Sequence, residues 1–267
     1  MPGAGPRLFS FDDLQVLTLA LRKYVVQSQN NAIARHDTFR VAISGGSLPV
    51  LLAKAFIDTP SSPEDEHDLL RLSKWDIFLA DERVVPLDHE DSNYRLVMAE
   101  FVNKLSAEFG EPKIHPISLD HTKENEPQEV ADLYQEELMH SFAAKDSVKL
   151  PVFDLLLLGC GPDGHTCSLF PQHELLNSTI SWVDAISNSP KPPPKRITLT
   201  MPVLTHGLRI AFVATGEGKR DILKKIFDTA DGKLLPCGLV NEKGAEKVTW
   251  FTDSKATEGV AFPKGSL

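Results

Sequence analysis

The sequence has few cysteines and no excess of positive charge. Its three cysteines, Cys160, Cys167 and Cys237, are too few and too unevenly spaced for a disulfide framework. Cys160 and Cys167, together with His165 and His173, match no standard zinc-finger or zinc-ribbon spacing, so we expect no metal. Lys and Arg total 28 against 37 Asp and Glu, a formal net charge of −9. That balance argues against a protein held to nucleic acid or anionic lipid by its overall charge.

Long hydrophobic runs are missing as well. No apolar stretch approaches the roughly 18 residues that a membrane-spanning helix needs. The short apolar run 16–21 follows Asp12 and Asp13, where a signal peptide carries positive charge. We therefore expect a cytoplasmic protein without a membrane partner. Apolar residues still make up 42% of the 267 residues, which is enough to bury a substantial core.

Short strand-like runs alternate with helical spacings along most of the chain. The most apolar run, Phe153–Leu158, is typical of a parallel strand that is buried on both faces. This alternation predicts an α/β fold, with a doubly wound, mostly parallel sheet and helices on both faces, in a single domain of residues 1–267. Further strands are expected at 39–43, 75–80, 114–117, 182–186, 196–200, 210–214 and 248–251, helices at 51–57, 94–109, 129–142 and 219–227, and surface loops at 60–66 and 189–194.

The N-terminal segment is expected to form one long helix. Apolar residues recur there at a spacing of three and four, and Ser10 with Asp13 resembles a capping box. This interpretation makes 39–43 the first strand of the sheet.

In an open parallel sheet, ligands bind beyond the carboxyl ends of the strands. The strand 39–43 ends in the tetrapeptide Ser44, Gly45, Gly46 and Ser47. Two glycines let the backbone approach a ligand, the hydroxyls add donors, and the following helix would point its free N–H groups at the same place. The tetrapeptide is therefore a candidate phosphate site, although a plain tight turn would need glycine too.

Charged residues also follow the second strand, as Asp81-Glu82-Arg83. The functional interpretation is that Arg83 faces the ligand while a carboxylate contacts the ligand's hydroxyl groups. The alternative is a solvated loop.

The segment Gly159–Thr166 after the apolar strand satisfies G-x-G-x-x-G, the spacing of a dinucleotide-binding turn. Pro162 offers no N–H to a pyrophosphate there, the Asp163 carboxylate would repel one, and Pro171 interrupts the following helix. We therefore expect no nucleotide cofactor. The segment does place His165 among glycines at the end of a buried strand, and the near-neutral pKa of histidine suits general acid–base catalysis.

Two basic residues could supply the cations that a phosphate requires. Arg196 opens an expected strand, and Lys219 lies at an expected junction between a strand and a helix. Basic residues at such positions are often merely solvated, but two at comparable strand ends favour a phosphate clamp.

Four stretches together resemble the 6-phosphogluconolactonase family. They occur in the family's order between about residues 40 and 220, and the Asp163–Pro171 stretch is the most specific of them. The matching pieces are Ser44–Ser47, Asp81–Val85 followed by Asp91–Tyr94, Gly161–Pro171, and Arg196–Thr200 with Gly218-Lys219.

The resemblance implies an enzyme that hydrolyses a phosphorylated sugar lactone without cofactor or metal, as a monomer or weak oligomer. The hypothesis is that the phosphate binds at Ser44–Ser47, clamped by Arg196 and Lys219, while His165 activates a water molecule. Arg83 would stabilise the oxyanion. Asp81 is the rival base, and the expected catalytic residues are His165, Asp81, Arg83 and Asp163.

Two alternatives share the fold. Glucosamine-6-phosphate deaminases carry an Asn-Glu-Pro segment and an Asp-Glu-Tyr segment, where this sequence has Leu169-Phe170-Pro171 and Asp81-Glu82-Arg83. The missing carboxylate favours the lactonase. A non-catalytic sugar-phosphate sensor, of the kind fused to a helix-turn-helix DNA-binding domain, is the other alternative.

Overall fold

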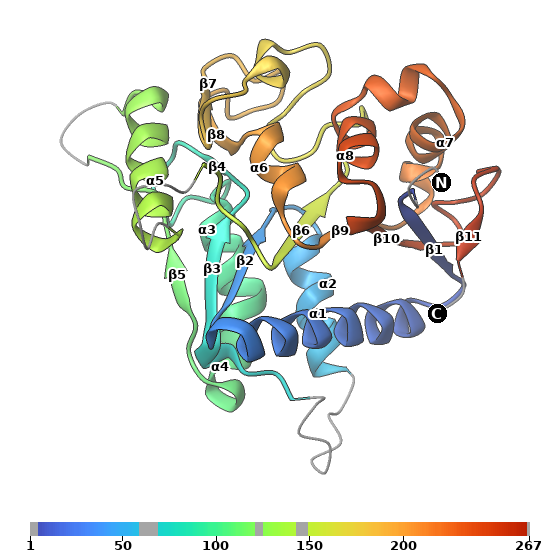
Figure 1. Cartoon of the computed structure of the whole chain (residues 1–267), viewed down its shortest axis with the longest axis horizontal. Helices are drawn as coiled ribbons and strands as arrows, with labels where there is room; N and C mark the ends of the chain where they lie inside the picture. Colours follow the sequence, from blue (N-terminus) through green and yellow to red (C-terminus); the bar gives the residue numbers. More distant parts are fainter. Residues whose placement is uncertain (1–4, 59–68, 121–124, 143–148, 266–267) are drawn as a thin grey trace.

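The computed structural model describes residues 5–58, 69–120, 125–142 and 149–265. Its centre is an eight-stranded sheet in the order β11-β1-β10-β9-β6-β2-β3-β5, in which every neighbouring pair is parallel (Figure 1). The predicted α/β class is confirmed. The strands are β1 (Arg7–Phe11), β2 (Phe39–Ile43), β3 (Trp75–Leu79), β5 (Lys113–His115), β6 (Leu155–Gly159), β9 (Ile210–Ala214), β10 (Val248–Asp253) and β11 (Lys264–Gly265).

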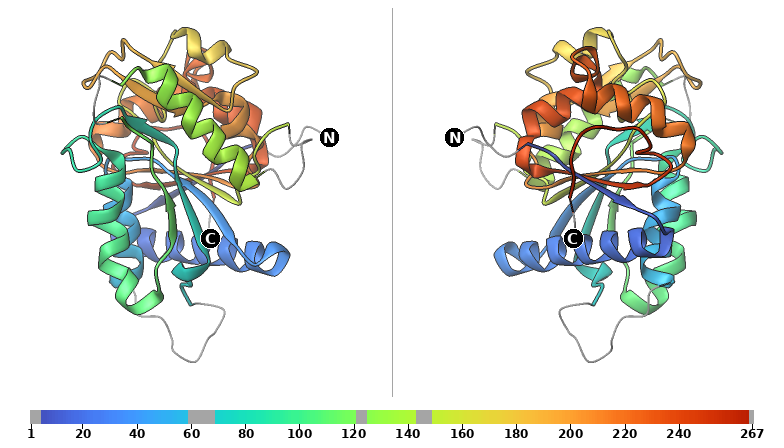
Figure 2. Two further views of the ribbon diagram at one scale, coloured as in Figure 1. Left: turned by 90° about the vertical axis from the view of Figure 1, so that its left-hand side faces the viewer. Right: turned by 90° about the vertical axis from the view of Figure 1, so that its right-hand side faces the viewer.

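Helices cover both faces of this sheet. Figure 2 shows α1, α2 and the α3–α4 segment on one face, and α6, α7 and α8 on the other. The short helices α6 and α8 were not expected from the sequence, and both begin with a proline in their first turn. The helices are α1 (Leu14–His36), α2 (Leu48–Ile57), α3 (Asn93–Val97), α4 (Asn103–Phe109), α5 (Pro127–Phe142), α6 (Met201–His206), α7 (Arg220–Asp228) and α8 (Pro236–Gly244).

Three further strands form a separate antiparallel sheet in the order β4-β8-β7. They are β4 (Asp81–Arg83), β8 (Arg196–Leu199) and β7 (Val183–Ile186). The charged residues that follow β3 therefore form a strand of their own, and Arg83 pairs in register with Arg196. Because β4 follows β3 after a single residue, this small sheet is held at the carboxyl edge of the large one.

The N-terminal segment differs from its prediction. Residues Arg7–Phe11 form β1, which lies between β10 and β11, and α1 starts only at Leu14. Asp13 is the N-cap residue, and its side chain accepts a hydrogen bond from the Gln15 N–H at 2.5 Å. The expected helix start at Ser10 is wrong because β1 is stabilised by pairing with β10, which a local apolar spacing cannot reveal.

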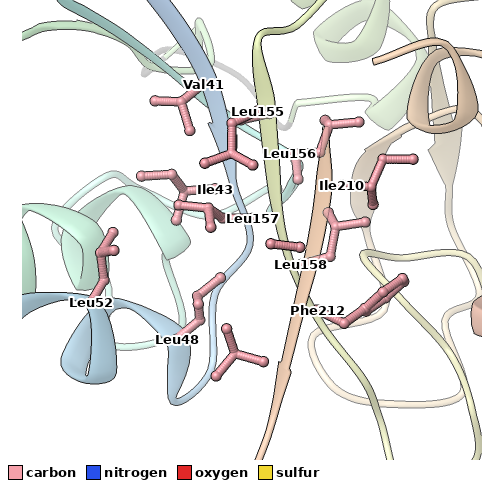
Figure 3. Close-up of a cluster of buried hydrophobic side chains, with 14 of the residues drawn as sticks. Val41, Ile43, Leu48, Leu52, Leu155, Leu156, Leu157, Leu158, Ile210 and Phe212 are labelled. Atoms are coloured by element: carbon pink, nitrogen blue, oxygen red, sulfur yellow. The ribbon is translucent and has the colours of Figure 1, made fainter. Parts of the chain in front are cut away.

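The strand β6 is buried in the core, as the sequence predicts. Leu155 to Leu158 are all fully buried, with β2 on one side and β9 on the other. Figure 3 shows these leucines beside the side chains of Ile43, Ile210 and Phe212, with Leu52 of α2 at the left. Because β2, β6 and β9 are parallel and in register, the segments that follow them emerge at one edge of the sheet.

Candidate active site

A cavity of about 240 Å³ lies at this carboxyl edge. Its lining brings together segments that follow β2, β3, β6 and β9 in the sequence. Of the residues proposed from sequence, the lining includes Ser44, Gly45, Gly46, Ser47, Asp81, Arg83, His165 and Lys219. Asn93, at the start of α3, is a lining residue that the sequence reasoning did not single out.

The turn after β6 holds His165 against its own backbone. A Cβ on Gly161 would lie 1.9 Å from His165 Nδ1, so only glycine leaves room for the ring. Gly164 has a φ of +84°, a left-handed conformation that favours glycine. The position of the imidazole therefore requires Gly161, and the backbone conformation of the turn favours Gly164.

Asp163 fixes the orientation of the imidazole. Its Oδ1 lies 2.5 Å from His165 Nδ1. An ionised carboxylate only accepts hydrogen bonds, so Nδ1 carries the proton and Nε2 keeps the lone pair. Burial raises the pKa of Asp163, but the hydrogen bonds and charges of His165 and Lys191 outweigh that effect and bring the pKa to about 2. Asp163 is thus ionised at neutral pH.

Lys191 is the third member of this group. Its Nζ lies 3.2 Å from Asp163 Oδ1 and 3.1 Å from His165 Nδ1. Burial lowers the pKa of His165, Asp163 raises it and Lys191 lowers it, and the net result lies below the usual 6.5. The imidazole is therefore neutral at pH 7. Lys191 comes from a proline-rich segment expected only to be a surface loop, and no sequence signal distinguished it.

Asp81 faces the same cavity from β4 and is almost completely buried. Its Oδ2 accepts a hydrogen bond from Ser168 Oγ at 2.8 Å, and its Oδ1 lies 3.3 Å from Asn93 Nδ2. Arg83 also lines the cavity, and its Nη1 donates to the backbone carbonyl of Asp91. The Arg83 Nε is buried and has no hydrogen-bond partner among the described residues.

Glu82, unlike Asp81, is not among the described residues that line the cavity, and its carboxyl group binds to the protein's own backbone. It is fully buried and accepts hydrogen bonds from the backbone N–H groups of Asn93 and Tyr94, each at 2.7 Å, and from Ser92 Oγ at 3.0 Å. Burial raises its pKa to about 7 against the opposing effect of these donors. Its carboxyl group ties β4 to the start of α3.

The Ser44–Ser47 turn connects β2 to α2. A Cβ on Gly45 would lie 1.9 Å from Asn93 Oδ1, and Gly46 has a φ of +73°. Ser47 is the N-cap of α2 but makes no side-chain capping bond. Pro49 has no N–H and the Leu51 N–H bonds to the Ser47 carbonyl, so the donors without an intrahelical partner are the Ser47 hydroxyl and the N–H groups of Leu48 and Val50. These donors are available to an anion.

Lys219 and Arg196 lie in different environments. Lys219 lines the cavity, and its Nζ donates to the Cys160 carbonyl at 2.6 Å. Arg196 is 3% exposed and is not among the described residues that line the cavity. Its guanidinium donates to the carbonyls of Lys191, Pro192 and Pro193 at 2.8–2.9 Å. Its Nη1 also lies 3.5 Å from Ser168 Oγ, the hydroxyl that donates to Asp81.

Two classes of feature are not found in the described parts of the chain. No group of three or more His, Cys, Asp or Glu side chains is arranged to hold a metal ion among the residues described. No described helix is both long and apolar enough to cross a membrane.

Comparison with known proteins places the chain in a family. The family model described as glucosamine-6-phosphate isomerases/6-phosphogluconolactonase matches residues 12–250. The chain belongs to that family. Among curated relatives, it is 46% identical over 252 residues to the probable 6-phosphogluconolactonase of Schizosaccharomyces pombe, covering 94% of each chain. It is 39% identical to the human 6-phosphogluconolactonase over 267 residues, covering 98% of this chain and 97% of the human one.

Solved structures of the family have the same fold. The 6-phosphogluconolactonase of Trypanosoma brucei superposes with a TM-score of 0.75 at 25% identity, covering 97% of this chain and all of the other. A structure titled devB protein gives a TM-score of 0.74 at 27% identity, covering 96% and 99% of the two chains. The resemblance to the 6-phosphogluconolactonases is confirmed, and with it the expectation of a lactone hydrolase.

Proposed function

We propose that the protein hydrolyses 6-phospho-D-glucono-1,5-lactone to 6-phospho-D-gluconate, a step of the oxidative pentose phosphate pathway, with His165 as the general base. The observation that carries this proposal is the short contact between Asp163 Oδ1 and His165 Nδ1, which leaves Nε2 unprotonated. His165 lines the same cavity as the Ser44–Ser47 turn, so one small ligand can contact both.

The phosphate end of the substrate is assigned to the Ser44–Ser47 turn. The support comes from the unpartnered donors at the start of α2 and from Lys219 on the same cavity. Binding the phosphate there fixes the remote end of the lactone, which makes the attack on its carbonyl a positioned event. Arg196 acts indirectly in this proposal, because its hydrogen bonds to the carbonyls of residues 191–193 hold the loop that carries Lys191.

In the reaction, His165 Nε2 takes a proton from a water molecule as the oxygen adds to C1 of the lactone. The resulting tetrahedral intermediate carries negative charge, for which the guanidinium of Arg83 on this cavity is a candidate donor. Collapse breaks the bond between C1 and the ring oxygen, and His165 returns the proton to that oxygen. Asp81 orients the water or a sugar hydroxyl in this scheme, with Ser168 fixing its carboxylate.

The test is His165→Ala, measured by adding the protein to fresh lactone and following 6-phosphogluconate with its dehydrogenase. Loss of a positioned base lowers kcat by about 100- to 10,000-fold, whereas KM changes little. His206→Ala, at an exposed position on α6, is the matched control and keeps the activity.

Unchanged turnover in His165→Ala would remove this residue from the mechanism. Release of ammonia from glucosamine 6-phosphate by the wild-type protein would point to the deaminase reaction instead, and tight sugar-phosphate binding without turnover would point to a sensor.

A further inference from the structure

A second cavity lies between β1 and α1, and none of its described lining residues lines the active-site cavity. Its volume is about 810 Å³, within the range of about 300–1,000 Å³ that small-molecule sites occupy. Figure 1 shows β1 running into the start of α1, so the two walls are consecutive in the sequence.

Both walls are built from one face of a regular element. Residues 16, 19, 20, 23, 24 and 27 of α1 line the cavity, a spacing of three and four that places them on one side of the helix. Arg7, Phe9 and Phe11 alternate along β1 and so point to one side of the sheet. These two elements form most of the lining, and Arg209, in the loop before β9, completes it.

The lining offers aromatic rings and exposed apolar groups. The rings of Phe9 and Phe11 are stacked with their centroids 6.4 Å apart. Val16 is 53% exposed on the helix side, although it is an apolar residue. The hydroxyl of Tyr24 is buried and has no hydrogen-bond partner among the described residues. This surface suits a planar ring with polar atoms at its edge.

The lining is also positively charged. Arg7, Lys23 and Arg209 contribute three cations, and no carboxylate is among the described residues of the lining. Arg7 donates to the Thr249 hydroxyl, and Arg209 lies over the Tyr24 ring and donates to side-chain oxygens of residues 27 and 28, so their described partners are uncharged. In a chain with a net charge of −9, such a cluster is a local positive patch that attracts anions.

We propose that this cavity binds a nucleoside polyphosphate, with the phosphates paired with Arg7, Lys23 and Arg209. The base would lie against Phe11, which is only partly buried, whereas Phe9 is 6% exposed and supports the Phe11 ring from behind. The aromatic wall and the uncompensated cations together select a ligand that carries both a planar ring and several negative charges. A sugar phosphate lacks the ring, and a neutral aromatic molecule lacks the charge.

Isothermal titration with ATP as the probe tests the proposal, with saturating 6-phosphogluconate present to occupy the active site. ATP binds with at least tenfold lower Kd than either tripolyphosphate, which lacks the ring, or adenosine, which lacks the charge. Lys23→Glu raises the Kd for ATP at least tenfold, and Val16→Glu does so as well. Lys54→Glu, an equal charge change at an exposed position on α2, leaves the Kd unchanged.

Three results would overturn the proposal. They are the absence of saturable ATP binding at millimolar concentration, equal Kd values for Lys23→Glu and Lys54→Glu, and equal affinity for ATP and tripolyphosphate. Lactonase activity of Lys23→Glu is expected to equal that of the wild type, which shows that the variant is folded and separates this site from the catalytic one.

Discussion

His165 lies between a carboxylate and an ammonium group that shift its pKa in opposite directions. Asp163 raises the pKa, whereas burial and Lys191 lower it, and the net direction is downward from 6.5. A general base must be unprotonated to accept a proton, so activity falls as the pH drops through the His165 pKa. The position of that acidic limb therefore reports on both neighbours.

Two substitutions are expected to move the acidic limb in opposite directions. Asp163→Asn removes the charge that raises the pKa of His165, so the limb of the kcat/KM profile shifts to lower pH. Lys191→Met removes a charge that lowers it, so the limb shifts to higher pH. The measurement is kcat/KM for each protein between about pH 4.5 and 8. Shifts in the same direction, or none, would show that His165 is not the group that titrates.

The segment after β6 positions His165 and Asp163, and it can do so because a glycine without a side chain leaves room for the imidazole. Gly161 lies directly under the imidazole, and the Gly161 N–H donates to the His165 carbonyl at 2.8 Å. Ser168, a few residues later, donates to Asp81 and connects this segment with β4. The Pro-rich segment that precedes β8 then brings Lys191 against Asp163. The segment after β6, the strand β4 and the Pro-rich segment before β8 are thus connected around the His165 ring. No one of them determines the position of the ring alone.

Gly161→Ala is expected to lower kcat about 100-fold, because displacement of a catalytic group by about 1 Å costs that much. The added methyl group would lie 1.9 Å from Nδ1 and 2.8 Å from Asp163 Oδ1, so the ring must move. Gly218→Ala is the control, since a methyl there would meet no described atom within 4 Å. Comparing kcat with the thermal midpoint of both variants separates displacement of the ring from loss of folding, and an active Gly161→Ala would contradict the account.

For the molecule as a whole, the sequence predicted best those site residues that directly follow a strand of the parallel sheet. The Ser44–Ser47 turn, Asp81 and His165 each follow an apolar run, and the sheet brings them together because its strands are parallel. Lys191 was not predictable, because a lysine among prolines has no local pattern. Arg196 was expected to clamp the phosphate with Lys219, which stays a prediction; its hydrogen bonds to the carbonyls of residues 191–193 could not be read from the sequence.

The N-terminal strand was missed for a related reason. Phe11, the last residue of β1, fits the start of a helical spacing, whereas the partner that makes Arg7–Phe11 a strand is β10, whose paired residues lie 242 positions further on. This pairing joins the two ends of the chain across the sheet, since β11 also pairs with β1. The stability of the whole domain should therefore depend on side chains of β1.

Leu8→Ala tests this dependence. Leu8 is 1% exposed in the core, so its truncation should lower the free energy of unfolding by about 2–5 kcal/mol. Leu14→Ala makes the same chemical change six residues later, where the side chain is 41% exposed, and should change stability by no more than about 0.5 kcal/mol. Urea denaturation of both variants measures the difference. If the segment were the first turn of a helix on the surface, the two losses would be similar and small, because neither leucine would leave a cavity behind.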